Sequence, residues 1–265
     1  MKIICDTNIW YNIGDGIISE EAIKGLYLVA TYNSIAELGR SPYLSDRSNL
    51  PRLQRAALAL VTHASKVDLR PPIEIIIKTH SIWFCRNKKI TQEMWQSLQI
   101  FARMDLSTIP EEKFTQMANA VNERKEPMDK IMGEINSGTL PEIRAKIGKG
   151  SKAHDALDTT PGVRKLVARM ASDHLLNAYQ KKKEFKEIKG YEPFILVMTY
   201  FFKQLELKNV EIFRTNDWMD MFNLVYIKNK NFLYWTYDKK WNTRLRKLGL
   251  GHFIFDPINT VSLIS

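Results

Sequence analysis

The chain has 265 residues, and its hydrophobic content of 45% with 11% aromatic residues excludes disorder of the whole chain. A formal net charge of +10 and a pI of about 9.4 favour a polyanionic partner, nucleic acid before an anionic membrane. Two cysteines give no disulfide framework, no signal peptide is evident, and the apolar stretch 193–202 is too short to span a bilayer, so we expect a cytoplasmic protein without a membrane partner.

The first 42 residues predict the order strand, helix, strand, helix. Residues 2–5 form a short apolar run typical of a buried strand, and residues 26–30 form a second one. Asn33 or Ser34 can cap the helix that follows the second run.

Residues 43–190 have a different hydrophobic pattern, which predicts a mostly helical region. Long amphipathic segments follow one another with prolines between them, at residues 53–67, 93–104 and 163–184. A basic run, Lys181, Lys182 and Lys183, lies at a predicted helix end. The run is either a solvated face or a patch that contacts phosphate groups, and the sequence leaves both interpretations open.

From residue 191 strands and helices alternate again. We expect helices at 194–205, 217–228 and 239–248, and strands at 210–215, 232–236 and 252–255. Such alternation predicts a parallel sheet in an α/β fold. The core would be discontinuous, built from residues 1–42 and 191–265, with residues 43–190 inserted as a large, mostly helical insertion.

Four acidic residues follow or lie near the apolar runs, namely Asp6, Glu37, Asp220 and Asp238. Three of these segments pair a short strand-like run with an acid at or soon after its carboxyl end, the edge where open parallel sheets bind ligands. Carboxylates gathered there repel one another unless divalent cations neutralise them. The pattern therefore predicts a metal site, and Mg²⁺ or Mn²⁺ suits ligands that are all oxygen.

Each acid also has a simpler structural interpretation. Asp6 can cap the turn after its strand, and Glu37 can be a solvated helix residue. Asp220 can stabilise the first turn of its helix through the macrodipole, and Asp238 can begin the helix after its strand. The five histidines show no close paired spacing, so nothing indicates a zinc site. The combination of four acids near one sheet edge carries the metal-site hypothesis.

Four short segments together resemble a PIN-like domain. They are Asp6-Thr7-Asn8 after the apolar start, Ala36-Glu37-Leu38 in the second helix, Asp220 eighteen positions before Asp238, and the closing segment Trp235-Thr236-Tyr237-Asp238-Lys239-Lys240. The resemblance covers residues 1–42 and 191–258. Each segment is short, and their order along the chain gives the resemblance its specificity.

The resemblance implies a Rossmann-like parallel sheet and a metal-dependent ribonuclease or structure-specific nuclease. It assigns the metal-binding, catalytic role to Asp6, Glu37, Asp220 and Asp238. Asp217 is an extra acid that can share or take over the third role, and Asn8 and Thr236 would be polar supports. The insertion of nearly 150 residues departs from compact members of the family, and a lid or a partner-binding module can lie there.

The leading hypothesis is therefore a cytoplasmic, metal-dependent PIN-like nuclease, with RNA favoured over DNA. The basic side chains expected to contact the phosphate backbone are Lys181, Lys182, Lys183, Lys239 and Lys240. Two aromatic pairs, Tyr234-Trp235 and Trp83-Phe84, can stack bases, although such pairs are more often part of a core. Two alternatives remain: a non-catalytic, partner-regulated nucleic-acid-binding protein, and a toxin-like nuclease that a protein inhibitor holds inactive.

Overall fold

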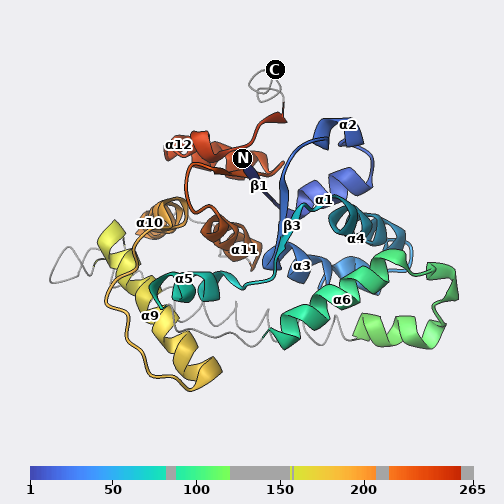
Figure 1. The fold of residues 1–265 in the computed structure, drawn as a ribbon, viewed down its shortest axis with the longest axis horizontal. Coiled ribbons are helices and arrows are strands. Elements are labelled where there is room, and N and C mark those ends of the chain that lie inside the picture. Colours follow the sequence, from blue (N-terminus) through green and yellow to red (C-terminus); the bar gives the residue numbers. More distant parts are fainter. Residues whose placement is uncertain (82–87, 120–155, 157, 207–214, 258–265) are drawn as a thin grey trace. The chain divides into compact units, whose positions relative to one another are not determined.

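The computed structural model describes residues 1–81, 88–119, 156, 158–206 and 215–257 (Figure 1). The chain divides into two compact units. The first unit contains Met1–Arg70, Asn87–Pro127 and Asn229–Ser265, and the second contains Pro71–Arg86 and Met128–Lys228.

The described part of the first unit contains one four-stranded parallel sheet. Its strands are β1 (Lys2–Cys5), β2 (Leu28–Thr31), β3 (Lys66–Asp68) and β4 (Phe232–Trp235), in the order β3-β2-β1-β4. Ile3 of β1 lies opposite Leu28 on one side and Leu233 on the other. The predicted α/β fold with a parallel sheet is confirmed, and the sheet joins strands from both ends of the chain.

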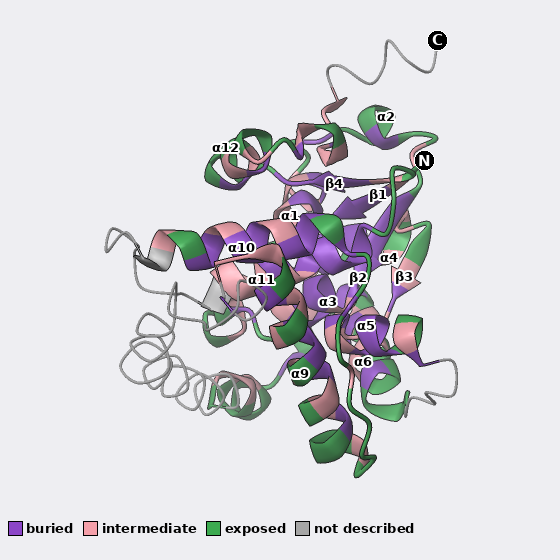
Figure 2. Cartoon of the chain, turned by 90° about the vertical axis from the view of Figure 1, so that its left-hand side faces the viewer, coloured by how far each residue is buried: buried purple, intermediate pink, exposed green. Residues whose placement is uncertain are grey.

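Both faces of the sheet are apolar, as expected for parallel strands. Successive side chains of a strand point to opposite faces, so residues that share a face alternate. One face belongs to a large hydrophobic cluster and carries Ile3, Cys5, Leu28, Ala30, Leu233 and Trp235. The other face carries Ile4, Val29 and Tyr234, which are also buried. Figure 2 accordingly shows these strands in the colour of buried residues.

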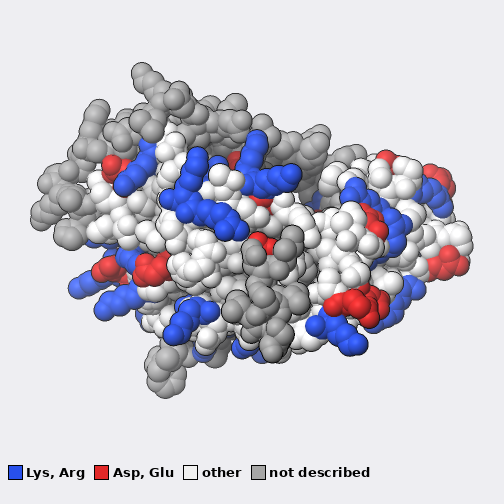
Figure 3. Space-filling view, turned by 90° about the horizontal axis from the view of Figure 1, so that it is seen from above, with Lys and Arg blue, Asp and Glu red and all other residues white. Residues whose placement is uncertain are grey.

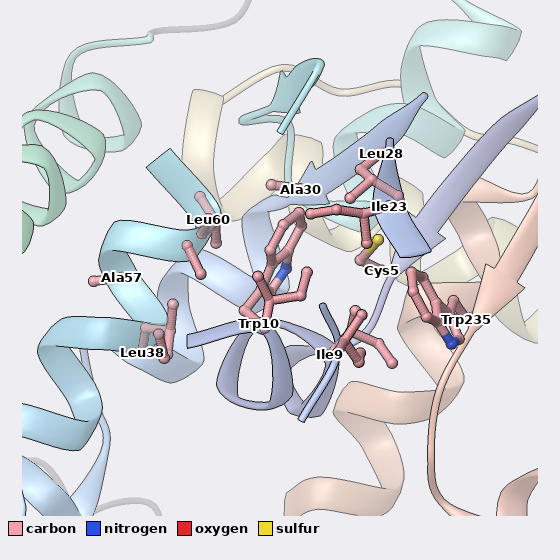
Figure 4. Packing of buried hydrophobic residues seen from close by; sticks show 14 of the residues in the cluster. Cys5, Ile9, Trp10, Ile23, Leu28, Ala30, Leu38, Ala57, Leu60 and Trp235 are labelled. Atoms are coloured by element: carbon pink, nitrogen blue, oxygen red, sulfur yellow. The ribbon is translucent and has the colours of Figure 1, made fainter. Parts of the chain in front are cut away.

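Helices of the first unit pack against the face with the large cluster. They are α1 (Thr7–Gly14), α2 (Glu20–Ile23), α3 (Tyr32–Leu38), α4 (Leu50–His63) and α6 (Lys89–Arg103). The unit also contains α12 (Lys239–Lys247) and the short 3-10 helices η1 (Pro42–Ser45), η2 (Leu106–Thr108) and η5 (Gly251–Phe253). Figure 4 shows the cluster around Trp10 of α1, with Leu60 of α4 and Ala30 of β2 among its neighbours. Burial of these apolar faces holds the helices on the sheet.

The close packing of α1 on α4 requires a glycine at the end of α1. A methyl group at Gly14 would lie 2.6 Å from the carbonyl carbon and oxygen of Arg55 and 2.8 Å from the backbone nitrogen of Ala56. Backbone atoms in a helix cannot move aside as a flexible side chain can. Gly14 therefore lets the two helices approach each other.

We expect Gly14→Ala to lower the free energy of unfolding by about 1–3 kcal/mol, as overpacking does. The helix propensity that alanine gains over glycine, at most about 1 kcal/mol, offsets part of this loss. Urea denaturation would measure the change, with Gly251→Ala as a control because its nearest new contact is an ordinary 3.5 Å to Arg246 Cγ. Equal midpoints for both variants would contradict the proposed close contact.

The described part of the second unit is helical. It contains α5 (Pro72–His80), α9 (Thr160–Tyr179), α10 (Glu192–Glu206), α11 (Thr215–Asn223) and the 3-10 helix η4 (Leu224–Tyr226). Ile77 of α5 packs with Ala171 and Leu175 of α9. The Tyr179 hydroxyl donates a hydrogen bond to the buried carboxylate of Glu74, which joins the same two helices.

The two units do not follow the predicted boundaries of core and insertion. The strand β3 and the helices α4 and α6 lie within residues 43–190, yet they belong to the unit that contains the sheet. Conversely, α10 and α11 lie within residues 191–265 and belong to the second unit. The apolar face of α4 explains its place, because Leu53, Ala56 and Leu60 are part of the cluster under the sheet.

Two predictions about local structure need correction, and a third falls mostly outside the described residues. Thr31, rather than Asn33 or Ser34, caps α3, because its hydroxyl accepts a hydrogen bond from Ser34 N at 3.2 Å. The predicted strand 252–255 is largely the 3-10 helix η5, and of these residues Ile254 forms an isolated parallel bridge with Tyr234. Most of the predicted strand 210–215 lies outside the described residues.

None of the helices in the described ranges combines the length and the apolar character that a membrane span requires. The expectation that the apolar stretch 193–202 does not span a bilayer agrees with this finding, since α10, which contains it, has 15 residues.

Candidate metal site at the sheet edge

The carboxyl ends of β1 and β4 lie side by side. Cys5 and Trp235, the last residues of the two strands, are partners in the parallel register, and Asp6 N donates a hydrogen bond to Trp235 O at 3.0 Å. The segment after β1 therefore begins beside the segment after β4. This juxtaposition places Asp6 next to Thr236, two residues before Asp238 in the sequence.

Asp6 is buried and accepts three hydrogen bonds. Its Oδ1 accepts from the backbone nitrogen of Thr7 at 2.8 Å, which caps α1. Its Oδ2 accepts from Asn8 Nδ2 and from Thr236 Oγ1, both at 2.7 Å. Donors from the segments after both strands therefore fix the carboxylate. Asp6 caps α1, as its simpler interpretation predicts, and it also lies at the candidate metal site.

Asn8 and Thr236 also join each other. Asn8 Nδ2 donates to Thr236 Oγ1 at 3.0 Å, and Asn8 Oδ1 accepts from the backbone nitrogen of Tyr237 at 3.2 Å. The Thr236 hydroxyl in turn accepts from Asp238 N at 3.1 Å. The two residues expected to be polar supports therefore hold the loops after β1 and β4 together and orient the Asp6 carboxylate.

Glu37 reaches the same edge from α3. The helix begins directly after β2, the neighbour of β1, and Ser34 Oγ donates to Cys5 O at 3.1 Å, which ties α3 to the end of β1. The Thr7 hydroxyl donates a hydrogen bond to Glu37 Oε2. Thr7 thus contacts both acids, through its backbone nitrogen and its side chain, and sequence reasoning assigned it no role.

The negative charges of these acids repel one another. Burial raises the pKa of Asp6, hydrogen bonds from Thr236 and Thr7 lower it in part, and the charge of Asp238 raises it further. Burial also raises the pKa of Glu37 to about 7, and the negative charge of Asp6 adds to that rise. Ionisation of both carboxyl groups is therefore unfavourable in this environment unless a positive charge lies beside them.

Asp238 combines a capping role with a position close enough for its charge to act on the buried Asp6. It begins α12, where its Oδ1 accepts from Trp241 N at 2.9 Å. The residue is exposed, and its charge acts on Asp6. The first unit therefore brings together Asp6, Glu37 and Asp238 at the carboxyl edge of the sheet.

The other predicted site residues belong partly to the second unit and partly to the first turn of α12. Asp217 and Asp220 lie on α11, in the second unit, so they are not part of the group that the first unit assembles. Lys181, Lys182 and Lys183 are exposed after the end of α9, also in the second unit. Lys239 and Lys240 are exposed in the first turn of α12, immediately after Asp238.

The donor chemistry of Asp6 and Glu37 fits a hard divalent cation. Within the described residues no three His, Cys, Asp or Glu side chains are arranged as a ready metal cage. Mg²⁺ in proteins usually takes one or two carboxylates and keeps several waters, so a pair of acids suffices. Asp6 Oδ1 accepts one hydrogen bond, which leaves it capacity for a further partner.

Of the two interpretations of the aromatic pair Tyr234-Trp235, base stacking or core packing, the structure supports the favoured one, core packing. Tyr234 and Trp235 are 0% and 1% exposed, so they belong to the core and cannot stack on a base. Trp83 and Phe84 lie outside the described residues. Tyr237, between Thr236 and Asp238, is instead 48% exposed.

Comparison of the chain with protein-family models, with curated proteins and with solved structures finds no match.

Proposed function

We propose that the protein is a cytoplasmic, divalent-metal-dependent nuclease of the PIN-like type that hydrolyses phosphodiester bonds, with RNA favoured over DNA. The observation that carries the proposal is the pair of acids Asp6 and Glu37 at the carboxyl edge of a parallel sheet. Both have raised pKa values, and their charges repel each other. A bound cation would relieve this repulsion.

A purely structural role accounts poorly for this arrangement. Asn or Ser would cap α1 about as well as Asp6 does, without placing a buried charge beside Glu37 and Asp238. Two side chains and one backbone nitrogen donate hydrogen bonds to the Asp6 carboxylate. These bonds fix its orientation, although burial makes its ionisation unfavourable. Clusters of acids with perturbed pKa values are typical of functional sites.

The residues of the first unit would have different roles in catalysis. Asp6 and Glu37 would hold Mg²⁺ or Mn²⁺, with Asp238 beside them, while Asn8, Thr236 and Thr7 keep the carboxylates in place. When bound, such a cation lowers the pKa of a water nucleophile and stabilises the charge that develops on the phosphate. The resemblance to PIN-like domains assigns Asp220, with Asp217 as an alternative, to the same group of ligands. It also implies products with a 5′-phosphate and a 3′-hydroxyl.

A non-catalytic, partner-regulated nucleic-acid-binding protein is the second candidate. It is favoured by the exposed basic residues Lys239 and Lys240 of α12, which can contact phosphate groups whether or not the strand is cleaved. Such a protein would keep the sheet and the basic surface, and its affinity for nucleic acid would depend little on Asp220 or Asp238. A toxin-like nuclease with a protein inhibitor stays a prediction, and growth arrest on expression that Asp238→Asn relieves would support it.

The test is cleavage of labelled single-stranded RNA, single-stranded DNA and a branched duplex, each with Mn²⁺, Mg²⁺ or EDTA. We expect the protein to cut RNA with either metal and not with EDTA. Comparison of the three substrates identifies the preferred one. Cleavage that persists in EDTA would contradict the metal-dependent mechanism, and absence of cleavage with every metal and substrate would favour the non-catalytic alternative.

A further inference from the structure

The exposed side of α12 is strongly basic. The nine-residue helix carries Lys239, Lys240, Arg244, Arg246 and Lys247 and contains no acidic residue. At 100° per residue, the side chains of residues 239, 240, 243, 246 and 247 share an arc of about 120°. Figure 3 looks onto the upper side of Figure 1, where α12 lies, and shows Lys and Arg side chains gathered there. We call Lys239, Lys240, Arg246 and Lys247 the basic face.

The opposite side of α12 anchors the helix in the protein. Trp241 and Leu245 are 3% and 1% exposed. A basic helix that binds a membrane inserts its apolar side chains between the lipids. The apolar side chains of α12 are already buried in the protein, so the basic face suits a soluble polyanion better than a bilayer.

The start of the basic face is fixed beside the acids. Asp238 caps α12 and its charge acts on Asp6, so Lys239 and Lys240 lie in the helical turn that begins at the candidate metal site. From Lys239 to Lys247 the helix extends about 12 Å, at 1.5 Å per residue. A nucleic-acid strand rises at least about 3.4 Å per nucleotide, so at most about four successive phosphates can lie along the basic face.

Tyr237 adds an aromatic surface at the same point. It lies between Thr236 and Asp238, its backbone nitrogen donates to Asn8 Oδ1, and the residue is 48% exposed. One partner of its ring is Trp235, with ring centroids 6.5 Å apart in a tilted arrangement. Exposed aromatic rings beside a basic groove stack unpaired bases, whatever the base.

We infer that the substrate is a single-stranded nucleic acid, whose phosphates lie along the basic face of α12 while a base next to the scissile phosphate stacks on Tyr237. This inference rests on the proposed function and specifies its substrate. The bases of a duplex are stacked on one another inside the helix and do not offer a face to Tyr237. A single strand can therefore use both the basic face and the aromatic ring, and a duplex can use the basic face alone.

Binding of labelled oligouridine and of its DNA counterpart, measured by fluorescence anisotropy over a series of salt concentrations, tests the inference. The full chain with Asp6→Asn is used in EDTA, so that cleavage cannot occur and one repelling charge is removed. The test pair is Lys240→Gln with Lys247→Gln. The control pair is Lys24→Gln with Lys66→Gln, both exposed in the first unit, with Lys66 on β3 at the other edge of the sheet from β4.

Both pairs lower the formal net charge of +10 by two, so a general charge effect would be equal in the two proteins. Each phosphate neutralised on a single strand contributes about 0.7 to the slope of log affinity against log salt. We expect the slope to fall by about 1.4 for the test pair and to stay unchanged for the control pair. Equal slopes for the two pairs, or no binding by the parent protein, would overturn the inference.

Substitutions at Tyr237 test the aromatic contact. We expect Tyr237→Ala to weaken single-strand binding about tenfold and Tyr237→Trp to restore it, because stacking requires only an aromatic face. Affinity for a duplex of the same length should be unchanged by Tyr237→Ala. An equal loss for single strand and duplex would overturn the stacking role, and tighter binding to an acidic peptide than to either strand would show a protein partner instead.

These results are separable from the test of the proposed function. If wild type cleaves in a metal-dependent way but the two lysine pairs behave alike, the proposed function stands and the path of the strand is wrong. If the lysine pairs differ but wild type cleaves nothing with Mn²⁺ or Mg²⁺, the binding surface stands and the nuclease proposal fails.

Discussion

Asp6→Asn should reduce metal-dependent cleavage by more than about 100-fold. Asp6 is the acid that both strand ends orient, through Asn8 and Thr236, and a neutral amide at that position binds a cation far less well than a carboxylate. Loss of an outer-shell partner of a metal site typically costs about 10–100-fold. The expected order is therefore a larger loss for Asp6→Asn than for Thr236→Val, measured as kcat/KM on one labelled substrate.

The fold should survive this substitution, because two opposing effects nearly cancel. Asn is as good a helix cap as Asp, so the hydrogen bond from Thr7 N is kept, and removal of the charge relieves the repulsion with Glu37 and Asp238. Against this, the amide nitrogen would face two donors, Asn8 Nδ2 and Thr236 Oγ1. We expect a net change within about 1 kcal/mol, near the net value of a typical hydrogen bond.

Asp105→Asn is the matched control for Asp6→Asn. Asp105 also caps a short helix, η2, where its side chain accepts from Ser107 N at 2.9 Å, and it belongs to the same unit. It lies on the exposed surface, so its substitution changes the net charge equally without touching the buried acids. Equal activity losses in the two variants, or unfolding of Asp6→Asn in thermal melts, would point to a structural role for Asp6.

The sheet was predictable because its strands are short apolar runs that end at polar residues. Residues 2–5, 26–30 and 232–236 contain or overlap β1, β2 and β4. The strand β3 was not predictable, because it has only three residues and directly follows the amphipathic pattern of α4. The boundaries of the two units were also missed, since they depend on long-range packing, such as the approach of α4 to α1 at Gly14.

The positions of three acids followed from the sequence because the carboxyl ends of adjacent parallel strands meet at one edge. The contact of the Thr7 hydroxyl with Glu37 did not, because it depends on how closely α1 and α3 approach each other. Tyr237 was missed for another reason. Strand alternation places residue 237 on the same face as the buried Trp235, but β4 ends at Trp235, so the Tyr237 ring leaves the sheet and is exposed.

Glu37→Gln should stabilise the metal-free protein at alkaline pH while it weakens metal-dependent cleavage. The folded protein holds the Glu37 pKa at about 7, above the ordinary value of 4.5, so between these values the folded state binds more protons than the unfolded state. The contribution of Glu37 to the free energy of unfolding is therefore fully present below about pH 4.5 and is lost as the pH rises through 7. A glutamine at this position would carry no such charge, and its side-chain oxygen can still accept the hydrogen bond from Thr7.

The difference between the two proteins should therefore depend on pH. Urea denaturation in EDTA should give nearly equal free energies of unfolding at about pH 4, and a gain of about 1–3 kcal/mol for Glu37→Gln at pH 8. Saturating Mg²⁺ should reverse the order at pH 8, because a bound cation stabilises the wild-type carboxylates and not the amide. A variant that is less stable than wild type at pH 8 without metal would mean that the Glu37 charge is already compensated within the protein. The need for a cation at this sheet edge, on which the nuclease proposal depends, would then disappear.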